Sequence, residues 1–314
     1  MAKTLDNKKS LMFLGGGKSE KEPLIFQTNG SPYRGFLDGR INKNQYQLIL
    51  RLSNMELKKV WLKELKTMDK KEALKIVQES GSDLANLSDK FKKDKDVVLE
   101  AIKQDAWSLL YANEKLKADK EIVLASVKQN GSNIQLAHDK LKADKEVVLA
   151  AVKQDGQAID YANEKLKADK EVVLAAVKQD GKAIDYANEK LKADKEVVLA
   201  AVKQKGNVLE YVDDNLKKDK EIVLIAVKSD GGTLEYADDS LKKDKEIVLA
   251  AIEQDSSALR YADEKFKADK KIVLEAVKKD ASLDYADNNL KADKEVVLAA
   301  VKQSGFNLEY ADKK

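Results

Sequence analysis

The segment "DKEVVLAAVKQDGQAIDYANEKLKA", residues 144–168, decides the fold, because it returns as "DKEVVLAAVKQDGKAIDYANEKLKA" at residues 169–193 with one position changed. Further copies follow at a step of 25 residues, and the last step is 24. Such self-similarity is typical of solenoids, in which each unit packs on its neighbours. The units begin at Asp69, Asp94, Asp119, Asp144, Asp169, Asp194, Asp219, Asp244, Asp269 and Asp293.

The first half of each unit predicts a helix, for example over Lys145–Gln154. Asp144 stands in the capping position before it, Glu146 lies in its first turn, and Lys153 lies in its last turn. Gly156 follows just beyond the end. Acid first, base last and glycine afterwards is the polarity that a helix prefers.

The second half predicts another helix, over about 157–167, in which Ile159, Ala162 and Leu166 form an apolar stripe. The run of residues 147–152 is apolar nearly all round, so its helix needs cover on several sides. The last step is one residue shorter than the others, and the deletion falls in "KKDASLDYA", residues 278–286, which indicates a turn there. A leucine-rich horseshoe has a similar period, but it needs an alternating leucine core and an asparagine ladder, which this sequence lacks. The sequence therefore predicts an all-α fold, an α-solenoid of about ten 25-residue helical-hairpin repeats.

The phrases "DKEVVLAAVKQDG" and "ALxYAxEKLK", where x is any residue, resemble the repeat family catalogued as domain of unknown function 4116. The resemblance covers residues 69–314. The family occurs in bacteria, including intracellular pathogens, and in large viruses and protists. The resemblance implies an interaction scaffold, with no shared activity, cofactor or catalytic residue attached to the family. A bacterial effector module that binds a host protein is the alternative that it leaves open.

The residues before the array predict two further parts. Residues 1–41 form an N-terminal segment with a glycine turn, and "PLIFQT" and "YRGFL" within it suggest a short β-hairpin. Residues 42–68 carry two capping-box patterns, which start helices over 43–51 and 54–67. We expect this divergent pair to cap the N-terminal end of the array, residues 69–314.

The stretch "MFLGGGKS", residues 12–19, ends as a phosphate-binding loop ends. The first glycine of that motif should stand at position 12, which is Met12. The loop should then open a helix, but Pro23 follows within four residues of Ser19. The sequence therefore predicts a glycine turn and no nucleotide site.

Composition narrows the classes of function. Charged residues make up 36% of the chain, yet the net charge is only +3, which disfavours general binding to nucleic acid or anionic membranes. Residues 1–68 hold 13 basic and 6 acidic side chains, so the head is basic and the remainder slightly acidic. The chain has no cysteine, and no apolar run approaches the roughly 20 residues that span a bilayer. We expect a cytoplasmic protein, or a delivered effector as the alternative.

One column of the array carries tyrosines, of which Tyr161, Tyr186, Tyr211 and Tyr236 are candidate interaction residues. A ladder of aromatic faces could stack the bases of a single strand, but it then needs an adjoining basic groove. A neighbouring column is instead Asn or Asp, followed by an acidic column. Half-buried tyrosines packed between units are the other interpretation.

The same acidic columns are a weak candidate for calcium, since carboxylates on a helix face beside lysines do not converge on an ion. His138, the chain's single histidine, falls in the Asn/Asp column and is interpreted as a surface substitution. Repetition argues against catalysis, because an active site needs one asymmetric set of residues. We therefore predict no catalytic, cofactor or metal site, and no enzyme.

Two further sets are candidates for protein contacts. The turn inside each unit varies between copies, and Trp107 and Phe306 are large aromatics at that turn with no periodic packing role. The last unit keeps its apolar residues although no unit follows it, which predicts a homo-oligomer that associates through the C-terminal end. The residues of that end are Val297, Val301, Leu308 and Tyr310. The predicted function is a non-catalytic scaffold for protein–protein interaction or self-assembly, with single-strand nucleic-acid binding through the basic head and tyrosine ladder as an alternative.

Overall fold

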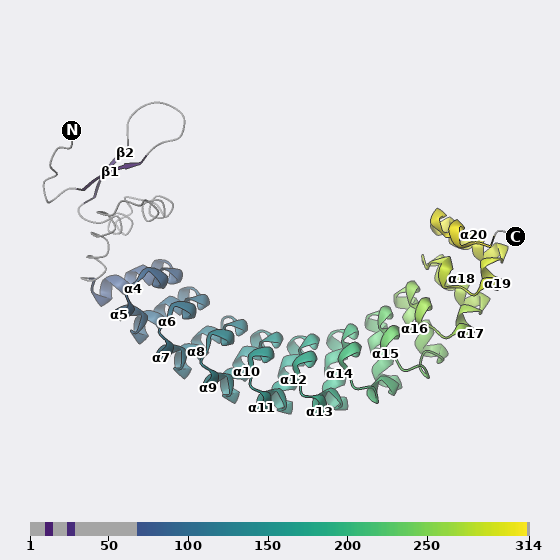
Figure 1. Ribbon diagram of the computed structural model, residues 1–314, viewed down its shortest axis with the longest axis horizontal. Coiled ribbons are helices and arrows are strands. Elements are labelled where there is room, and N and C mark those ends of the chain that lie inside the picture. The colour runs from purple at the N-terminus through teal and green to yellow at the C-terminus, as the bar shows by residue number, and fades with distance from the viewer. Residues whose placement is uncertain (1–9, 15–23, 29–67, 313–314) are drawn as a thin grey trace. The chain divides into compact units, whose positions relative to one another are not determined.

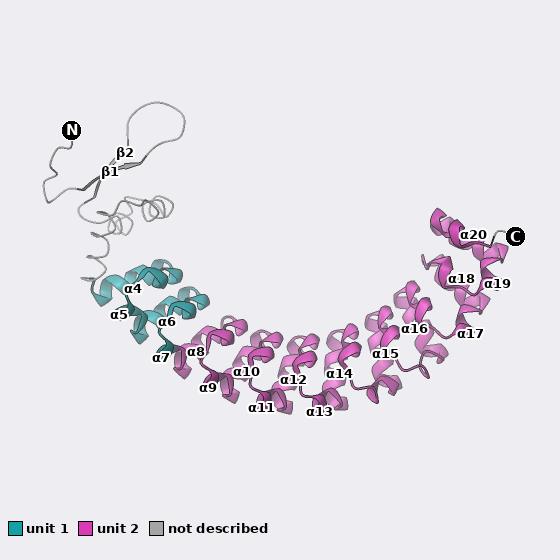
Figure 2. Ribbon diagram, viewed as in Figure 1, with its two compact units in different colours: residues 1–116 teal, residues 117–314 magenta. Residues whose placement is uncertain are grey.

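The computed structural model describes residues 10–14, 24–28 and 68–312 (Figure 1). The chain divides into two compact units, residues 1–116 and residues 117–314 (Figure 2). Residues 68–116 of unit 1 and the described residues of unit 2 are built from the same helical repeat, and the expected all-α repeat solenoid is confirmed. In unit 2 the repeats lie side by side in chain order.

Two short strands precede the repeats. Strand β1 (Ser10–Leu14) pairs antiparallel with strand β2 (Leu24–Thr28), and Leu14 lies opposite Leu24. The expected strand in "PLIFQT" is thus confirmed, but its partner comes from before the glycine segment. "YRGFL" lies outside the described residues. The connection from β1 leads into an antiparallel strand, whereas a phosphate-binding loop leads into a helix.

The long helices of the repeats are close to ten residues each. In chain order they are α4 (Lys70–Glu79), α6 (Lys95–Gln104), α8 (Lys120–Val127), α10 (Lys145–Gln154), α12 (Lys170–Gln179), α14 (Lys195–Gln204), α15 (Lys220–Ser229), α16 (Lys245–Gln254), α18 (Lys270–Lys278) and α20 (Lys294–Gln303).

Each long helix is followed by a 3₁₀-helix, and in most repeats by a one-turn α-helix. The 3₁₀-helices after the long helices are η1 (Gly81–Asn86), η2 (Ala106–Tyr111), η3 (Gly131–Leu136), η4 (Gly156–Tyr161), η5 (Gly181–Tyr186), η6 (Gly206–Tyr211), η8 (Gly231–Tyr236), η9 (Ser256–Tyr261), η10 (Leu283–Tyr285) and η11 (Gly305–Tyr310). The short helices are α5 (Asp89–Lys92), α7 (Glu114–Lys117), α9 (Asp139–Lys142), α11 (Glu164–Lys167), α13 (Glu189–Lys192), η7 (Leu216–Lys218), α17 (Glu264–Lys267) and α19 (Asn288–Lys291).

Local hydrogen bonds explain the long helix. The Asp144 carboxylate accepts the backbone N–H groups of Glu146 and Val147 at 3.0 and 3.2 Å, which satisfies two of the donors that a helix start leaves free. Asp155 ends the helix in an extended conformation, and its side chain then accepts the N–H of Gln157. One aspartate therefore closes the α-helix and caps the 3₁₀-helix that follows.

The expected second helix is wrong in its detail, because it is two pieces rather than one. The 3₁₀-helix η4 ends at Tyr161, Ala162 is extended with ψ 153°, and α11 begins at Glu164. The N–H of Asn163 donates to the carbonyl of Lys142 in the preceding repeat, at 3.1 Å. A continuous helix would direct that N–H into its own backbone, so the bond between repeats breaks the helix.

The core consists of the positions that the pattern predicted. Val147, Val148, Val152 and Ile159 are fully buried, and Leu166 keeps 8% of its surface exposed. The long helix is not covered all round, however, since Leu149 and Ala150 are half-exposed. Neighbouring repeats pack on two sides of the long helix, and its outward side remains open.

The column of glycines has a different cause from the expected one. A Cβ on Gly156 would lie 2.5 Å from the carbonyl oxygen of Ala176 in the next repeat, closer than non-bonded atoms approach. Equivalent distances of 2.3–2.6 Å occur at Gly81, Gly131, Gly181, Gly206 and Gly231. Glycine was expected to end the long helix, but Asp155 does so. The glycine instead allows the backbones of successive repeats to approach each other.

The one-residue deletion shortens a connection, as expected. Helix α18 ends at Lys278, Asp280 has a positive φ of 80°, and η10 keeps three residues where most repeats have six. Aspartate tolerates this left-handed conformation better than most residues do. The predicted capping helices at 43–51 and 54–67 lie outside the described residues, so the domain boundaries at 41 and 68 stay predictions.

We predict that Gly156→Ala destabilises the chain by about 1–3 kcal/mol, since its Cβ meets a backbone atom that cannot turn away. Gly305→Ala is the matched control, because a Cβ there meets nothing within 4 Å. Thermal unfolding followed by circular dichroism measures both changes. Equal shifts in melting temperature for the two variants would contradict the packing role of the glycine column.

Candidate functional site

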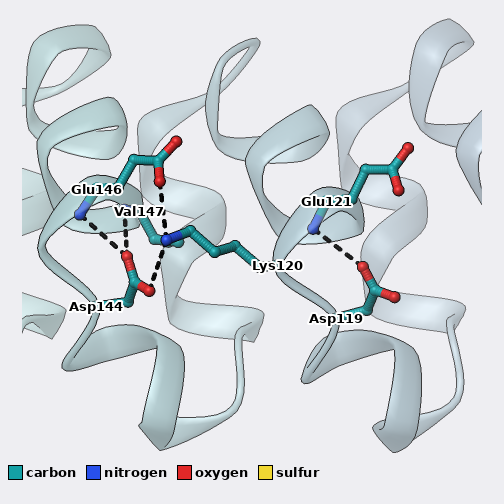
Figure 3. Close-up of polar contacts among 6 residues, drawn as sticks. All are labelled: Asp119, Lys120, Glu121, Asp144, Glu146 and Val147. Atoms are coloured by element: carbon teal, nitrogen blue, oxygen red, sulfur yellow. Dashed lines mark hydrogen bonds and ion pairs between the residues drawn. The ribbon is translucent and has the colours of Figure 1, made fainter.

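A charged contact joins successive long helices, and we call it the lysine clamp. The Lys120 ammonium lies 2.8 Å from a carboxylate oxygen of Asp144 and 2.8 Å from one of Glu146 (Figure 3). Asp144 uses its other oxygen to cap α10. The clamp thus joins the first residue of one long helix to the N-terminus of the next.

The clamp recurs along unit 2 and once within unit 1. In unit 1, Lys70 bonds to Asp94 and Asp96 at 2.9 and 2.6 Å. In unit 2, the later clamps have lysine-to-aspartate distances of 2.7–2.9 Å. Their residues are Lys145 with Asp169 and Glu171, Lys170 with Asp194 and Glu196, Lys195 with Asp219 and Glu221, Lys220 with Asp244 and Glu246, and Lys270 with Asp293 and Glu295.

The clamp changes the acidity of its members. The hydrogen bond from Lys145 lowers the pKa of Asp169, and the equivalent lysines lower the pKa of Asp194 and Asp219. The same bonds raise the pKa of the lysines. Each bond therefore favours the charged form of both partners.

One clamp in unit 2 is missing. Lys271 stands where the other long helices have an acid, and no ion pair joins Lys245 to α18 among residues 117–312. Helix α18 also lacks an acidic residue in its first turn. The start of α18 therefore lacks a contact that α10, α12, α14, α15, α16 and α20 make to the preceding repeat.

A backbone ladder also joins the repeats. The N–H of the second residue after each of these 3₁₀-helices donates to the carbonyl of a lysine in the preceding repeat, at 2.9–3.2 Å. In unit 2 the donors are His138, Asn163, Asn188, Asp213, Asp238, Asp263, Asp287 and Asp312. Several of these side chains also cap the short helix, as Asn163 does by accepting the N–H of Leu166.

This ladder explains the Asn/Asp column that the sequence offered as a weak calcium candidate. Its side chains act locally as caps, and no group of three or more metal-ligating side chains occurs in the part of the chain that the structure describes. His138 is exposed and caps α9, where its Nδ1 accepts the N–H of Lys140 at 3.3 Å. The interpretation of His138 as a surface substitution agrees with this position.

The tyrosine column forms a row on the 3₁₀-helices of unit 2. Tyr161 and Tyr236 keep 39% and 37% of their surface exposed, so the expected half-buried state is found. An exposed residue precedes each tyrosine: Asp160, Asp185, Glu210, Glu235, Arg260, Asp284 and Glu309. We call the residues at 160–161, 185–186, 210–211 and 235–236 the tyrosine strip.

Carboxylates set the electrostatics of the strip. Glu210 accepts a hydrogen bond from Tyr211 and raises the pKa of that phenol to about 12. Burial raises the pKa of Tyr186, and the charges of Asp160 and Asp185 add to this effect. The charge of Glu210 is the main cause of the raised pKa of Tyr236. The strip is therefore negative, which disfavours a phosphate backbone.

The two candidate aromatics at the variable turn are exposed. Trp107, in unit 1, keeps 43% of its surface exposed, and Phe306, in unit 2, keeps 86%. The next residue of this turn lies in the core, since Ser108, Asn133, Ala158 and Asn307 are buried. The variable turn therefore contributes one surface position and one core position in each repeat.

The C-terminal candidates lie on α20 and η11. Val297 and Val301 are half-exposed, although their equivalents Val148 and Val152 are fully buried. Leu308 keeps 64% of its surface exposed. These side chains form the surface with which an internal repeat contacts the next one, while Tyr310 is as exposed as the other tyrosines.

A second surface lies over the long helices. An open depression of about 610 Å³ covers Leu149 and Ala150 of α10, and the clamp pair Lys145 and Glu171 borders it. Among the described residues, no helix has the length and apolar character needed to cross a membrane. The lining of the depression also includes Lys128, Glu146, Lys153 and Gln154.

The sequence interpretation missed two features of these surfaces. The clamp was legible in the recurring "DK" and "DKE" letters, which were assigned only to capping. The carboxylates before the tyrosines fall within the predicted second helix, whose apolar stripe gives no reason to pair them with tyrosines. The partner of each clamp lysine lies in another repeat, so no local pattern identifies it.

Comparison with protein families gives one match. The family described as domain of unknown function (DUF4116) matches residues 69–117, 119–167, 169–217, 219–267 and 268–314, so each match spans two repeats or nearly so. Comparisons with curated proteins and with solved structures give no match.

We predict that Lys271→Glu stabilises the chain by about 0.5–1 kcal/mol, because it supplies the missing acid to Lys245 and to the start of α18. Lys271→Gln is the control, since it removes a charge without adding a partner. Chemical denaturation of the three proteins measures the difference. A Glu variant no more stable than the Gln variant would show that the clamp adds nothing at this position.

The lowered pKa values of the clamp aspartates predict that the folded chain loses stability at acidic pH. These aspartates stabilise the folded chain fully at a pH above 3.8, the pKa of an aspartate in the unfolded chain. The stabilisation is lost as the pH falls through the lower pKa that they have in the folded chain. We expect the combined variant Lys145→Met, Lys170→Met and Lys195→Met to lose less melting temperature than the wild type between about pH 5 and pH 2. Equal losses of melting temperature in the two proteins would show that the clamp does not cause the loss of stability in acid.

Proposed function

The chain belongs to the DUF4116 family across residues 69–314, and we propose that it is a non-catalytic scaffold that binds protein partners on the surface of its repeats. The observation that carries this proposal is the tyrosine strip. Its phenols are half-exposed in four successive repeats, whereas the clamp, the backbone ladder and the glycine column hold the repeats together. Half-exposed aromatic side chains are common anchors at protein interfaces.

The repetition of the described side chains also supports a scaffold over an enzyme. The clamp and the backbone ladder recur in several repeats of residues 68–312, while catalysis needs groups with distinct roles in one place. The negative strip weighs against the alternative of a single-strand nucleic-acid reader, since such readers pair aromatic faces with a cationic groove.

The test of the scaffold proposal is a partner capture with a matched variant. Tyr161→Leu, Tyr186→Leu, Tyr211→Leu and Tyr236→Leu are combined in one chain, which should remain folded because Leu136 occupies this column in its own repeat. We expect proteins that the immobilised wild type retains, identified by mass spectrometry, to be lost from this variant. Retention of the same proteins by both chains would show that the strip is not the interaction site. Binding of a labelled oligothymidylate to the wild type, with no protein retained, would favour the nucleic-acid alternative.

We also propose that the exposed face of α20 and η11 associates with the same face of a second copy. An isologous pairing would bury Val297, Val301 and Leu308, whose equivalents are buried by the next repeat within the array. The face is thus already shaped to receive a repeat surface.

For this face we expect light scattering to give a concentration-dependent dimer that Val301→Glu converts to a monomer. Lys302→Glu is the control, because Lys302 is an exposed neighbour on the same helix and should leave the dimer intact. A wild type that stays monomeric at high micromolar concentration would refute self-association through this face. If both variants dissociated the dimer equally, the added negative charge, and not the loss of the Val301 contact, would explain the result.

A further inference from the structure

One residue of unit 2 indicates which ligand chemistry the tyrosine row accepts. Arg260 stands where the strip has carboxylates, and its guanidinium lies over the Tyr261 ring, 4.5 Å from the centroid. It donates a hydrogen bond to the hydroxyl of Tyr261, and its pKa is raised by this bond and by the hydroxyl of Tyr285 in the next repeat. A guanidinium is thus held on the tyrosine row by a ring face and a phenol oxygen, with a second phenol close by.

The four repeats before Arg260 offer the same aromatic row without an internal cation at that position. Their tyrosines are preceded by the exposed carboxylates Asp160, Asp185, Glu210 and Glu235. An arriving cation would find a ring face, a phenol oxygen and a carboxylate in each of these repeats. Arginine suits such a place best, because its planar group stacks on rings and donates several hydrogen bonds at once.

We propose that the tyrosine strip binds an extended basic peptide segment, with about one arginine or lysine side chain in each repeat. This inference rests on the proposed scaffold function and names its class of partner. The occupant is a protein segment rather than a polyanion, since the strip carries an exposed carboxylate in each of its four repeats.

The spacing of the repeats sets the spacing of the basic residues. Packed helices lie roughly 8–10 Å apart, so successive tyrosines advance by about that distance. A polyproline II peptide rises about 3.1 Å per residue and returns to the same face after three residues, roughly 9 Å along. A partner with a basic residue at every third position therefore matches the strip.

Two lysines lie close to the strip and affect the expected affinity. Lys205 is paired with Asp180 at 2.9 Å, so its charge is balanced within the array. Lys182 is exposed and lies three residues before Asp185 on η5. Since residues three apart on a 3₁₀-helix share a side, Lys182 opposes a basic ligand there. Lys182→Gln should therefore tighten binding.

The test uses a fluorescent peptide of four Arg-Pro-Ser triplets and the full chain, with binding followed by fluorescence anisotropy. One variant neutralises the strip through Asp160→Asn, Asp185→Asn, Glu210→Gln and Glu235→Gln. The control makes the same change of charge in the same four repeats through Glu164→Gln, Glu189→Gln, Asp214→Asn and Asp239→Asn. Those carboxylates are 85–90% exposed, and each pairs with the lysine three residues later in the same repeat, so the control should stay folded.

We expect the strip variant to weaken binding by at least about tenfold and the control variant by less than about threefold. A peptide of equal composition with its four arginines in a row should bind more weakly than the triplet peptide, and a Glu-Pro-Ser peptide should not bind. Equal losses in the two variants, or equal affinity for both arginine peptides, would overturn the proposal. If no basic peptide binds while the tyrosine variant still loses captured proteins, the scaffold function stands and this partner class is wrong.

Discussion

The stacking of the repeats depends on the aspartate at the start of the long helix, which makes two kinds of contact. Asp144 satisfies the free N–H groups of its own helix with one oxygen and holds the lysine of the preceding repeat with the other. The helix cap and the contact between repeats are therefore the same side chain. Loss of that carboxylate would affect both, which ties local helix formation to the stacking of the repeats.

The repeats are also joined through the backbone. The N–H of Asn163 bonds to a carbonyl of the preceding repeat, and Gly156 permits close approach to the following one. Main-chain contacts need few particular side chains, and they explain why Asn, Asp and His share one column. Together the clamp, the ladder and the glycine contact fix each repeat against its neighbours, so the outward side chains are not needed for stacking.

This division of labour matters for function. The clamp and core positions recur almost unchanged, while the exposed position of the variable turn and the residue before each tyrosine differ between repeats. Arg260 illustrates the consequence, since one substitution turns a carboxylate site into a filled guanidinium site on the same tyrosine row. A repeat array can thus change its surface chemistry step by step without disturbing its interior.

The sequence by itself determined the period, the long helices and their caps, and most of the core. It did so because these depend on contacts within a few residues: Asp144 reaches the next two or three N–H groups, and Val148 and Val152 share one face of one helix. The resemblance to the repeat family followed from the same letters. The sequence also identified the tyrosine row and the exposed aromatics, since both stand out by residue type.

Only the tertiary structure decided the break after Tyr161, the role of Gly156 and the partner of each clamp lysine. These depend on atoms in a neighbouring repeat, 20 to 25 residues away along the chain. In a periodic sequence every column repeats at that distance, so the letters alone cannot say which two columns meet. Packing selects the pairs, because only one offset brings a donor, an acceptor and a gap without a Cβ to the same place.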